Sequence, residues 1–305
     1  MRKQPTRAHT EAPQEKDPID TILEAADLTW LILKAPIKFS PEPTKGLQEL
    51  EIEGYQVLYR SDTNQQLAIV SSRHRVWQPR EVIDFYLSIA AFYGLAFESV
   101  GYVQGGLRIW GLLNTGYKSA LPRNRSASTY LLLSTCCDSS LAAQATALCL
   151  LEPGTLATPA SIGSQSVARI ARSPEFLTPS DLAEIGELTR ECIAFPTFLG
   201  DLAKQAVSEE NIKQATAATF GPRDDDPNRP SAKTLRSIVS ALREGRSSSK
   251  SPLTALDLLY ALAAVSDARE QRRSPADLLN NTWFGVGAKR KQLAINALAR
   301  LIRPY

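Results

Sequence analysis

Basic and aromatic side chains recur together between residues 73 and 125, and this part of the sequence is the most able to bind a ligand. Guanidinium and ammonium groups neutralise phosphates, and aromatic rings offer surfaces on which nucleic-acid bases stack. The candidate phosphate-binding residues are Arg73, Arg75, Arg80, Arg108, Lys118, Arg123 and Arg125, and the candidate stacking residues are Trp77 and Tyr102. If these side chains line one trough, the sequence predicts a site for single-stranded nucleic acid.

Three aromatic or basic residues fall in one apolar run, residues 101–113. There Tyr102, Arg108 and Trp110 are separated by even numbers of residues. Side chains at even spacing along a strand share a face, so one strand would present all three on the same side. The other interpretation is that Tyr102 and Trp110 belong to a hydrophobic core and that the arginines of the following loop are only solvated.

A catalytic site is hard to assemble from this sequence. The chain has two histidines, His9 and His74, so a nucleophile–base pair would have to use His74. No glycine-rich phosphate loop and no G-x-S-x-G elbow occurs. We therefore expect a protein that is not an enzyme, with an unrecognised site around His74 and Asp138 as the alternative.

The metal-binding residue types do not indicate a cofactor. The four cysteines, Cys136, Cys137, Cys149 and Cys192, contain no C-x-x-C pair, which argues against a zinc site and a disulfide framework. Residues 224–226 are three aspartates in a proline-containing segment that is more typical of a solvated loop. We expect no metal, no cofactor and a reducing, cytoplasmic location. No apolar run reaches the roughly 18 residues of a membrane helix, so no membrane partner is expected.

The elements that must position these residues begin with three apolar runs, 101–113, 129–135 and 143–151. Separated by turn-forming residues, they are typical of consecutive antiparallel strands, with turns at 105–106 and 138–140. Further elements are expected as helices at 19–27, 80–93, 180–207 and 209–220, a strand at 29–34 that Pro36 ends, a hairpin at 54–60 and 66–71, and a loop at 152–166. Helices at 232–243, 255–267, 274–280 and 287–302 would follow.

This pattern predicts an α+β protein: an antiparallel sheet with a β-β-β-α core packed by helices, plus an all-helical C-terminal part. We expect a disordered tail over 1–18, an α+β core domain over 19–220, a linker over 221–231 and a helical region over 232–305. The net charge of +3 in 305 residues carries no argument for nucleic acid by itself, so a basic footprint must come from local clustering.

Several of these stretches resemble a family of phage- and plasmid-borne proteins defined by a domain of unknown function (domain of unknown function 932), from Leu67 to Leu301. The matching stretches are residues 75–86 (RVWQPREVIDFY), 101–110, 130–135 (YLLLST), 254–267 and 284–289 (FGVGAK). The chain departs from the family at Cys149, Glu152 and Gly154, where Arg, Cys and Asn are usual, and at residues 169–172, where a histidine is expected. The resemblance implies a mobile-element protein of the bacterial cytoplasm and no established activity.

The order of helix, hairpin, third strand and long helix is also similar to the core of Rad52-type single-strand annealing proteins, in topology only. From these observations we expect a single-stranded DNA-binding protein that serves strand annealing or recombination in a phage or plasmid, and the analogy implies a homo-oligomer. The alternative is a non-enzymatic accessory or counter-defence protein that acts through protein–protein contacts, with its helical C-terminal third docking a partner.

Overall fold

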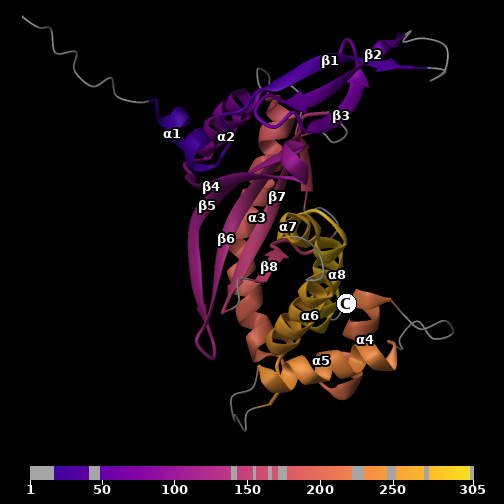
Figure 1. Cartoon of the computed structure of the whole chain (residues 1–305). Coiled ribbons are helices and arrows are strands. Elements are labelled where there is room, and N and C mark those ends of the chain that lie inside the picture. Colours follow the sequence, from indigo (N-terminus) through magenta and orange to yellow (C-terminus); the bar gives the residue numbers. More distant parts are fainter. Residues whose placement is uncertain are drawn as a thin grey trace, which may run out of the picture.

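The computed structural model describes residues 17–40, 49–138, 143–153, 156–163, 167–170, 177–221, 230–245, 252–270 and 275–302. Within these ranges the strands form two antiparallel sheets, and helices cover both faces of the larger one (Figure 1). The expected α+β class is confirmed, with a helical C-terminal part.

The larger sheet contains the three strands expected from the apolar runs. Its order is β4 (Ala96–Val103), β5 (Arg108–Leu121), β6 (Arg125–Cys136), β7 (Ala143–Glu152) and β8 (Leu156–Pro159), and β9 (Val167–Ile170) also pairs with β7. β8 pairs with residues 148–151 of β7 and β9 with residues 143–146, so the two short strands share one edge. β8 lies inside the segment expected to be a loop, because four residues suffice to pair with the end of a long neighbour.

The β4–β5 turn is a one-turn 3-10 helix, η1 (Gln104–Gly106), in which Gly105 and Gly106 have φ of 69° and 110°. The expected glycine turn is therefore confirmed, but it shifts the side-chain alternation. Tyr102 pairs with Ile109, and Val103 pairs with Arg108. Tyr102 thus lies on the opposite face from Arg108 and Trp110, and the expectation that all three share a face is wrong, because the turn interrupts the strand between them.

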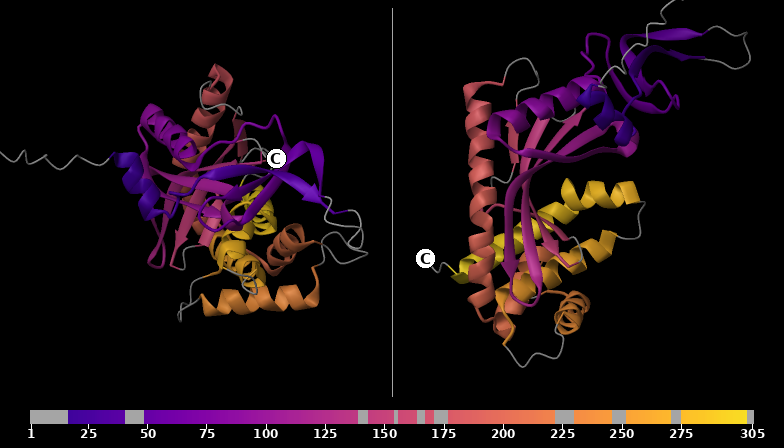
Figure 2. Two further views of the ribbon diagram at one scale, coloured as in Figure 1. Left: turned by 45° about the horizontal axis from the view of Figure 1, so that its top comes forward. Right: turned by 90° about the vertical axis from the view of Figure 1, so that its left-hand side faces the viewer.

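One face of the larger sheet, the α3 face, carries Ile109, Leu131 and Leu133, all of them buried. Helix α2 (Pro79–Tyr93) packs on its upper part, where the Tyr86 hydroxyl donates to the Ile109 carbonyl at 3.0 Å. Helix α3 (Pro179–Lys204) runs along the same face over β5, β6 and β7 (Figure 2). Gly94 ends α2 in the left-handed conformation, as the sequence predicts.

The opposite face, the α7 face, carries Leu112, Leu132 and Leu148. Trp283 and Phe284, at the junction of α7 (Pro275–Trp283) and α8 (Val286–Ile302), pack on it. The helices α4 (Glu209–Phe220), α5 (Ala232–Glu244) and α6 (Ala255–Glu270) complete the C-terminal part. Buried side chains of α6 and α8 belong to the same hydrophobic cluster as those of α3 and the sheet.

The smaller sheet consists of β1 (Ile32–Phe39), β2 (Leu50–Arg60) and β3 (Gln66–Ser71), and it extends beyond the rest of the chain at the top of Figure 1. β1 continues through Pro36, contrary to expectation, because an edge strand can accommodate a residue without an N–H. Helix α1 (Pro18–Ala25) precedes this sheet, with the Asp17 side chain as its N-terminal cap. One face of the sheet buries Ile32, Leu58 and Val70.

The other face of the smaller sheet is apolar and uncovered within the described part of the chain. Leu31, Leu33, Tyr55 and Ile69 are 52%, 37%, 53% and 58% exposed. The register aligns Leu33 with Tyr59 and Val57 with Ile69, so these side chains share that face. Contiguous exposed apolar patches are uncommon on monomeric proteins, so this face is a candidate interaction surface.

All four cysteines, Cys136, Cys137, Cys149 and Cys192, are buried and none forms a disulfide. Burial raises the pKa of Cys137 and of Cys192 to about 12 in each case. Among the helices of the described ranges, none has the length and apolar character needed to cross a bilayer.

Candidate nucleic-acid interface

The predicted basic residues lie at two ends of the larger sheet. The His74 side chain is 2.8 Å from the carbonyl oxygen of Cys137, which ties the segment with Arg73 and Arg75 to the end of β6 beside Arg108. Lys118, Arg123 and Arg125 lie at the other end, around the β5–β6 turn. At about 3.3 Å per residue, the 14 residues of β5 separate the two groups by roughly 40 Å. The described residues therefore do not form one trough from residue 73 to residue 125.

Two of the predicted residues, Trp77 just before α2 and Arg80 in its first turn, make contacts within the fold. Trp77 is 9% exposed, and its ring packs edge-on against Phe85 with centroids 5.7 Å apart. Arg80 forms ion pairs with Asp17 and Asp20, which join α2 to α1. Arg73 and Arg75 lie exposed in the connection between β3 and α2.

Tyr102 likewise has internal partners. Its hydroxyl donates to Asp27 at 3.0 Å, and its ring lies edge-on to Trp30. The Arg60 guanidinium stacks over both rings, 4.3 Å from the Trp30 centroid and 5.0 Å from that of Tyr102. Arg60 also donates two hydrogen bonds to the Asp62 carboxylate. The rings of Trp30 and Tyr102 are therefore already stacked on a guanidinium of the same chain.

Arg108 is a predicted residue that the structure brings against an aromatic ring on the α7 face. It is 8% exposed, its guanidinium carbon lies 4.5 Å from the Phe284 ring centroid, and it contacts Asn280 at 3.4 Å. Trp110, on the same face, packs edge-on against Trp283 with centroids 5.0 Å apart. β5 and the α7–α8 junction thus build a basic and aromatic cluster on the α7 face.

Next to this cluster lies a cavity of about 480 Å³, the α7–α8 pocket. Trp283 and Phe284 form part of its wall. Its polar lining comes from β7 and from the last two helices: Gln144, Thr146, Thr282, Lys289 and Gln292. Such a volume, with apolar walls and a few polar groups, is typical of a site for a small organic group.

Polar atoms without partners lie at and near the α7–α8 pocket. The Gln292 amide nitrogen donates to the carbonyls of Ser161 and Gly163, at 3.0 and 3.3 Å. Its amide oxygen is buried and has no hydrogen-bond partner among the described residues, and neither does the indole nitrogen of Trp110. Both atoms are buried, and burying such groups unpaired costs free energy in the packing beside the pocket.

The charge at this pocket is positive. Lys289 is the one charged residue among the described residues that line it, and it is exposed. Arg169 of β9 is paired with Gln144 in register, so its exposed side chain shares the α7 face with that lining residue. Farther along the same face, Glu98 and Glu152 bring negative charge, and Lys118 pairs with Glu152 at 3.6 Å.

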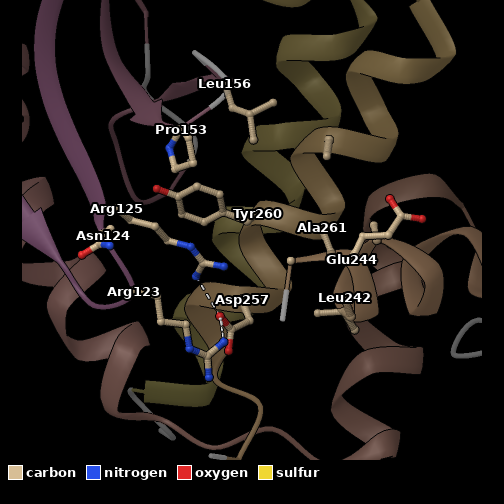
Figure 3. A pocket seen from close by; sticks show the side chains of 13 residues that line it. Arg123, Asn124, Arg125, Pro153, Leu156, Leu242, Glu244, Asp257, Tyr260 and Ala261 are labelled. Atoms are coloured by element: carbon tan, nitrogen blue, oxygen red, sulfur yellow. Dashed lines mark hydrogen bonds and ion pairs between the residues drawn. The ribbon is translucent and has the colours of Figure 1, made fainter. Parts of the chain in front are cut away.

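The second group of predicted residues lines a different cavity, of about 630 Å³, between the β5–β6 turn, α5 and α6 (Figure 3). Arg123 and Asn124 have φ of 66° and 55°, and this left-handed turn directs Arg123 and Arg125 to one carboxylate. Both donate to the same oxygen of Asp257, at 2.7 Å each. This cavity is named here the hairpin pocket.

The Asp257 carboxylate is fixed by hydrogen bonds from Thr254, at the start of α6. Its second oxygen accepts from the backbone N–H and the hydroxyl of Thr254, both at 3.0 Å. Burial alone would raise the pKa of Asp257, but the hydrogen bonds from Thr254 and Arg125 outweigh burial and lower it. The Arg125 guanidinium also stacks 4.2 Å from the ring centroid of Tyr260, whose hydroxyl donates to the Glu152 carbonyl.

The residues missed by the sequence-based prediction are Arg169, Trp283, Phe284, Lys289 and Gln292. The adjacent aromatic pair at 283–284, just before the glycine-containing segment, was an available signal. Trp283, Phe284, Lys289 and Gln292 approach β7 through contacts across more than 100 residues, which periodicity does not reveal.

Comparison with known proteins gives one match. Residues 66–150 match the family model described as a domain of unknown function (DUF932). No curated protein and no solved structure matches the chain. The resemblance expected from the sequence is therefore confirmed over residues 66–150, from β3 to β7, where the chain is similar to this family.

Proposed function

We propose that the protein binds single-stranded DNA on the α7 face, with one base entering the α7–α8 pocket. The observation that carries this proposal is the combination of an aromatic wall, Trp283 and Phe284, with a positive rim supplied by Lys289. Aromatic rings stack on bases, and lysine and arginine neutralise the adjoining phosphates. Strand annealing in phage or plasmid recombination is the process that such binding would serve.

The polar atoms of the pocket support a base rather than a purely apolar group. A base edge has both hydrogen-bond donors and acceptors, and the side chains of Gln144, Thr146 and Thr282 supply both kinds of group to the lining of the pocket. Thr146 and Gln144 line the same cavity and make no side-chain hydrogen bond to the described residues. Arg169 and Arg108 extend the basic character on either side of the pocket.

The test is titration of a fluorescently labelled oligonucleotide at two or more salt concentrations. Each neutralised phosphate of a single strand changes the slope of log K against log salt by about 0.7. We expect Lys289→Gln to weaken binding and to reduce that slope by about this amount. The matched control is Lys233→Gln, an exposed lysine on α5, which should leave both unchanged.

The aromatic wall has its own test. Stacking on one aromatic side chain contributes about 1–3 kcal/mol per base, so Trp283→Ala should weaken binding by roughly 5- to 150-fold and Trp283→Phe by much less. No binding at low salt, binding without a salt slope, or an unchanged slope in Lys289→Gln would refute the proposal. The lysine variant answers the question even if Trp283→Ala proves unstable.

A second candidate is a protein that acts through protein–protein contacts, and the uncovered face of the smaller sheet favours it. We propose that a second copy of this chain covers that face. Leu33, Tyr55 and Ile69 are at least 37% exposed, and the aligned residues carry no charge that would repel an identical surface. Sedimentation should show self-association that Ile69→Asp abolishes. A monomer at all concentrations would rule it out.

A further inference from the structure

The hairpin pocket contains guanidinium groups that the fold uses only in part. Arg125 is largely buried, with 9% of its side chain exposed, yet the only hydrogen bond it makes within the described ranges is from Nη1 to Asp257. A guanidinium has five N–H donors in a fixed plane. The N–H groups on Nε and Nη2 are therefore available to a ligand, since neither nitrogen is among the fully buried atoms that lack a partner.

Arg123 adds a second cation beside the first. Its side chain is 25% exposed, and it shares the Asp257 oxygen with Arg125. Two guanidiniums on one carboxylate leave an excess of one positive charge at this wall. Because the depressed pKa keeps Asp257 ionised at neutral pH, that excess is constant across the physiological range.

The rest of the cavity defines the shape of the ligand. Tyr260 and Pro153 provide apolar surface beside the guanidiniums, and Glu244, from α5, lines the facing side (Figure 3). A Cβ atom added to Gly245 would lie 3.8 Å from Arg125 Nη2, so the end of α5 limits the room at that nitrogen. These residues enclose a cavity of about 630 Å³ beside the two guanidiniums.

We infer that the hairpin pocket binds the oxyanion, phosphate or carboxylate, of a small organic molecule. Arg125 and Arg123 hold the oxyanion through paired N–H donors. Glu244 disfavours a second negative charge on the ligand and accepts a hydrogen bond from its hydroxyl or amine. This site is separate from the α7–α8 pocket and does not depend on the proposed DNA binding.

The experiment measures the thermal midpoint of the full chain against increasing inorganic phosphate, and separately acetate, with chloride adjusted to hold the ionic strength. A ligand that binds the folded state raises the midpoint progressively with its concentration. We expect phosphate or acetate to do so, and the more effective of the two identifies the oxyanion. Glu244→Gln should bind it about three- to tenfold more tightly, because the opposing charge is gone.

Arg125→Lys keeps the charge but loses the planar fork, and it should weaken binding at least about tenfold. Glu53→Gln, an exposed carboxylate on β2, is the control for Glu244→Gln. The inference is overturned if neither anion stabilises the wild type or Glu244→Gln beyond chloride, or if Arg125→Lys responds like the wild type. Loss of the phosphate effect in Lys289→Gln would also overturn it, because the anion would then occupy the α7–α8 pocket.

Discussion

Replacing Asp257 by Asn tests how the C-terminal helices are fastened to the sheet. The substitution keeps the shape of the side chain and removes its charge. Asp257 is 5% exposed and accepts hydrogen bonds from Arg123 and Arg125 at 2.7 Å. It is the link between the β5–β6 turn and the first turn of α6, so the variant leaves two guanidiniums without a counter-charge.

The expected cost follows from these contacts. A hydrogen bond to a charged group contributes about 1.5–3 kcal/mol and a neutral one about 0.5–1.5 kcal/mol, so two weakened bonds cost roughly 2 kcal/mol. Leaving a buried ion without its partner costs about 3–5 kcal/mol, but Arg123 is one-quarter exposed and keeps some hydration. We therefore expect a loss of about 3 kcal/mol in the free energy of unfolding. At about 2 °C per kcal/mol, the midpoint falls by roughly 6 °C.

Urea denaturation of four proteins measures this effect: the wild type, Asp257→Asn, Arg125→Met and the double variant. Because the two residues are in direct contact, the double variant should lose at least about 1 kcal/mol less than the sum of the single losses. Asp84→Asn is the matched control, since Asp84 is exposed on α2, and it should change stability by less than about 0.5 kcal/mol.

The reasoning is refuted if Asp257→Asn costs less than about 1 kcal/mol or if the two substitutions are additive. The same variant also separates stability from ligand binding. Removing the carboxylate raises the positive charge of the hairpin pocket, so Asp257→Asn should be less stable and yet bind phosphate more tightly. A variant that loses both properties together would contradict the second part of this expectation.

Three further predictions concern stability. The hydrogen bond from Arg60 lowers the pKa of Asp62 to about 2, whereas the pKa in the unfolded chain is about 3.9. The contribution of Asp62 to stability is therefore present above pH 4 and is lost as the pH falls toward 2. Denaturation of the wild type and of Asp62→Asn at pH 2–5 measures this loss. Gly111→Ala would place a Cβ atom 2.7 Å from the Tyr86 ring and should cost about 1–3 kcal/mol of stability. The control is Gly200→Ala on α3, where a Cβ atom meets open space, and it should be neutral or slightly stabilising. Thermal denaturation measures both variants. Lys291 is fully buried and donates a hydrogen bond to Asp267 at 2.8 Å. Burial raises the pKa of Asp267, so without Lys291 this carboxylate takes up a proton more readily at pH 5 than at pH 8. Lys291→Met should therefore destabilise the protein less at pH 5 than at pH 8 in urea titrations.

The sequence predicts the individual helices and strands of this fold well, because the spacing of apolar residues and the residue types that favour turns are local properties. The runs at 101–113, 129–135 and 143–151 become neighbouring strands, and Gly94 ends its helix as expected. The short strands β8 and β9 were missed because each has only four residues, too few to show a strand pattern in the sequence. The prediction that Pro36 ends its strand was wrong because the effect of a proline depends on whether the strand lies at the edge of its sheet.

The site was harder to predict than the fold. Basic residues close in sequence diverge to opposite ends of a strand, and Arg108 instead meets Phe284, 176 positions later. An exposed arginine can already be paired with carboxylates of the same chain, as Asp17 and Asp20 show for Arg80. Composition predicts that cations are present, but only tertiary packing determines which of them remain accessible to a ligand.

The buried cysteines give the chain a built-in reporter of local opening. Cys137 directly follows β6, whereas Cys149 of β7 and Cys192 of α3 lie between that helix and the sheet, and burial raises the pKa of each thiol. Alkylating reagents attack the thiolate, so each sulfur reacts only when its surroundings open. Pulsed alkylation followed by peptide mass spectrometry would rank how often α3 lifts from the sheet relative to the fraying of β6, without any engineered label.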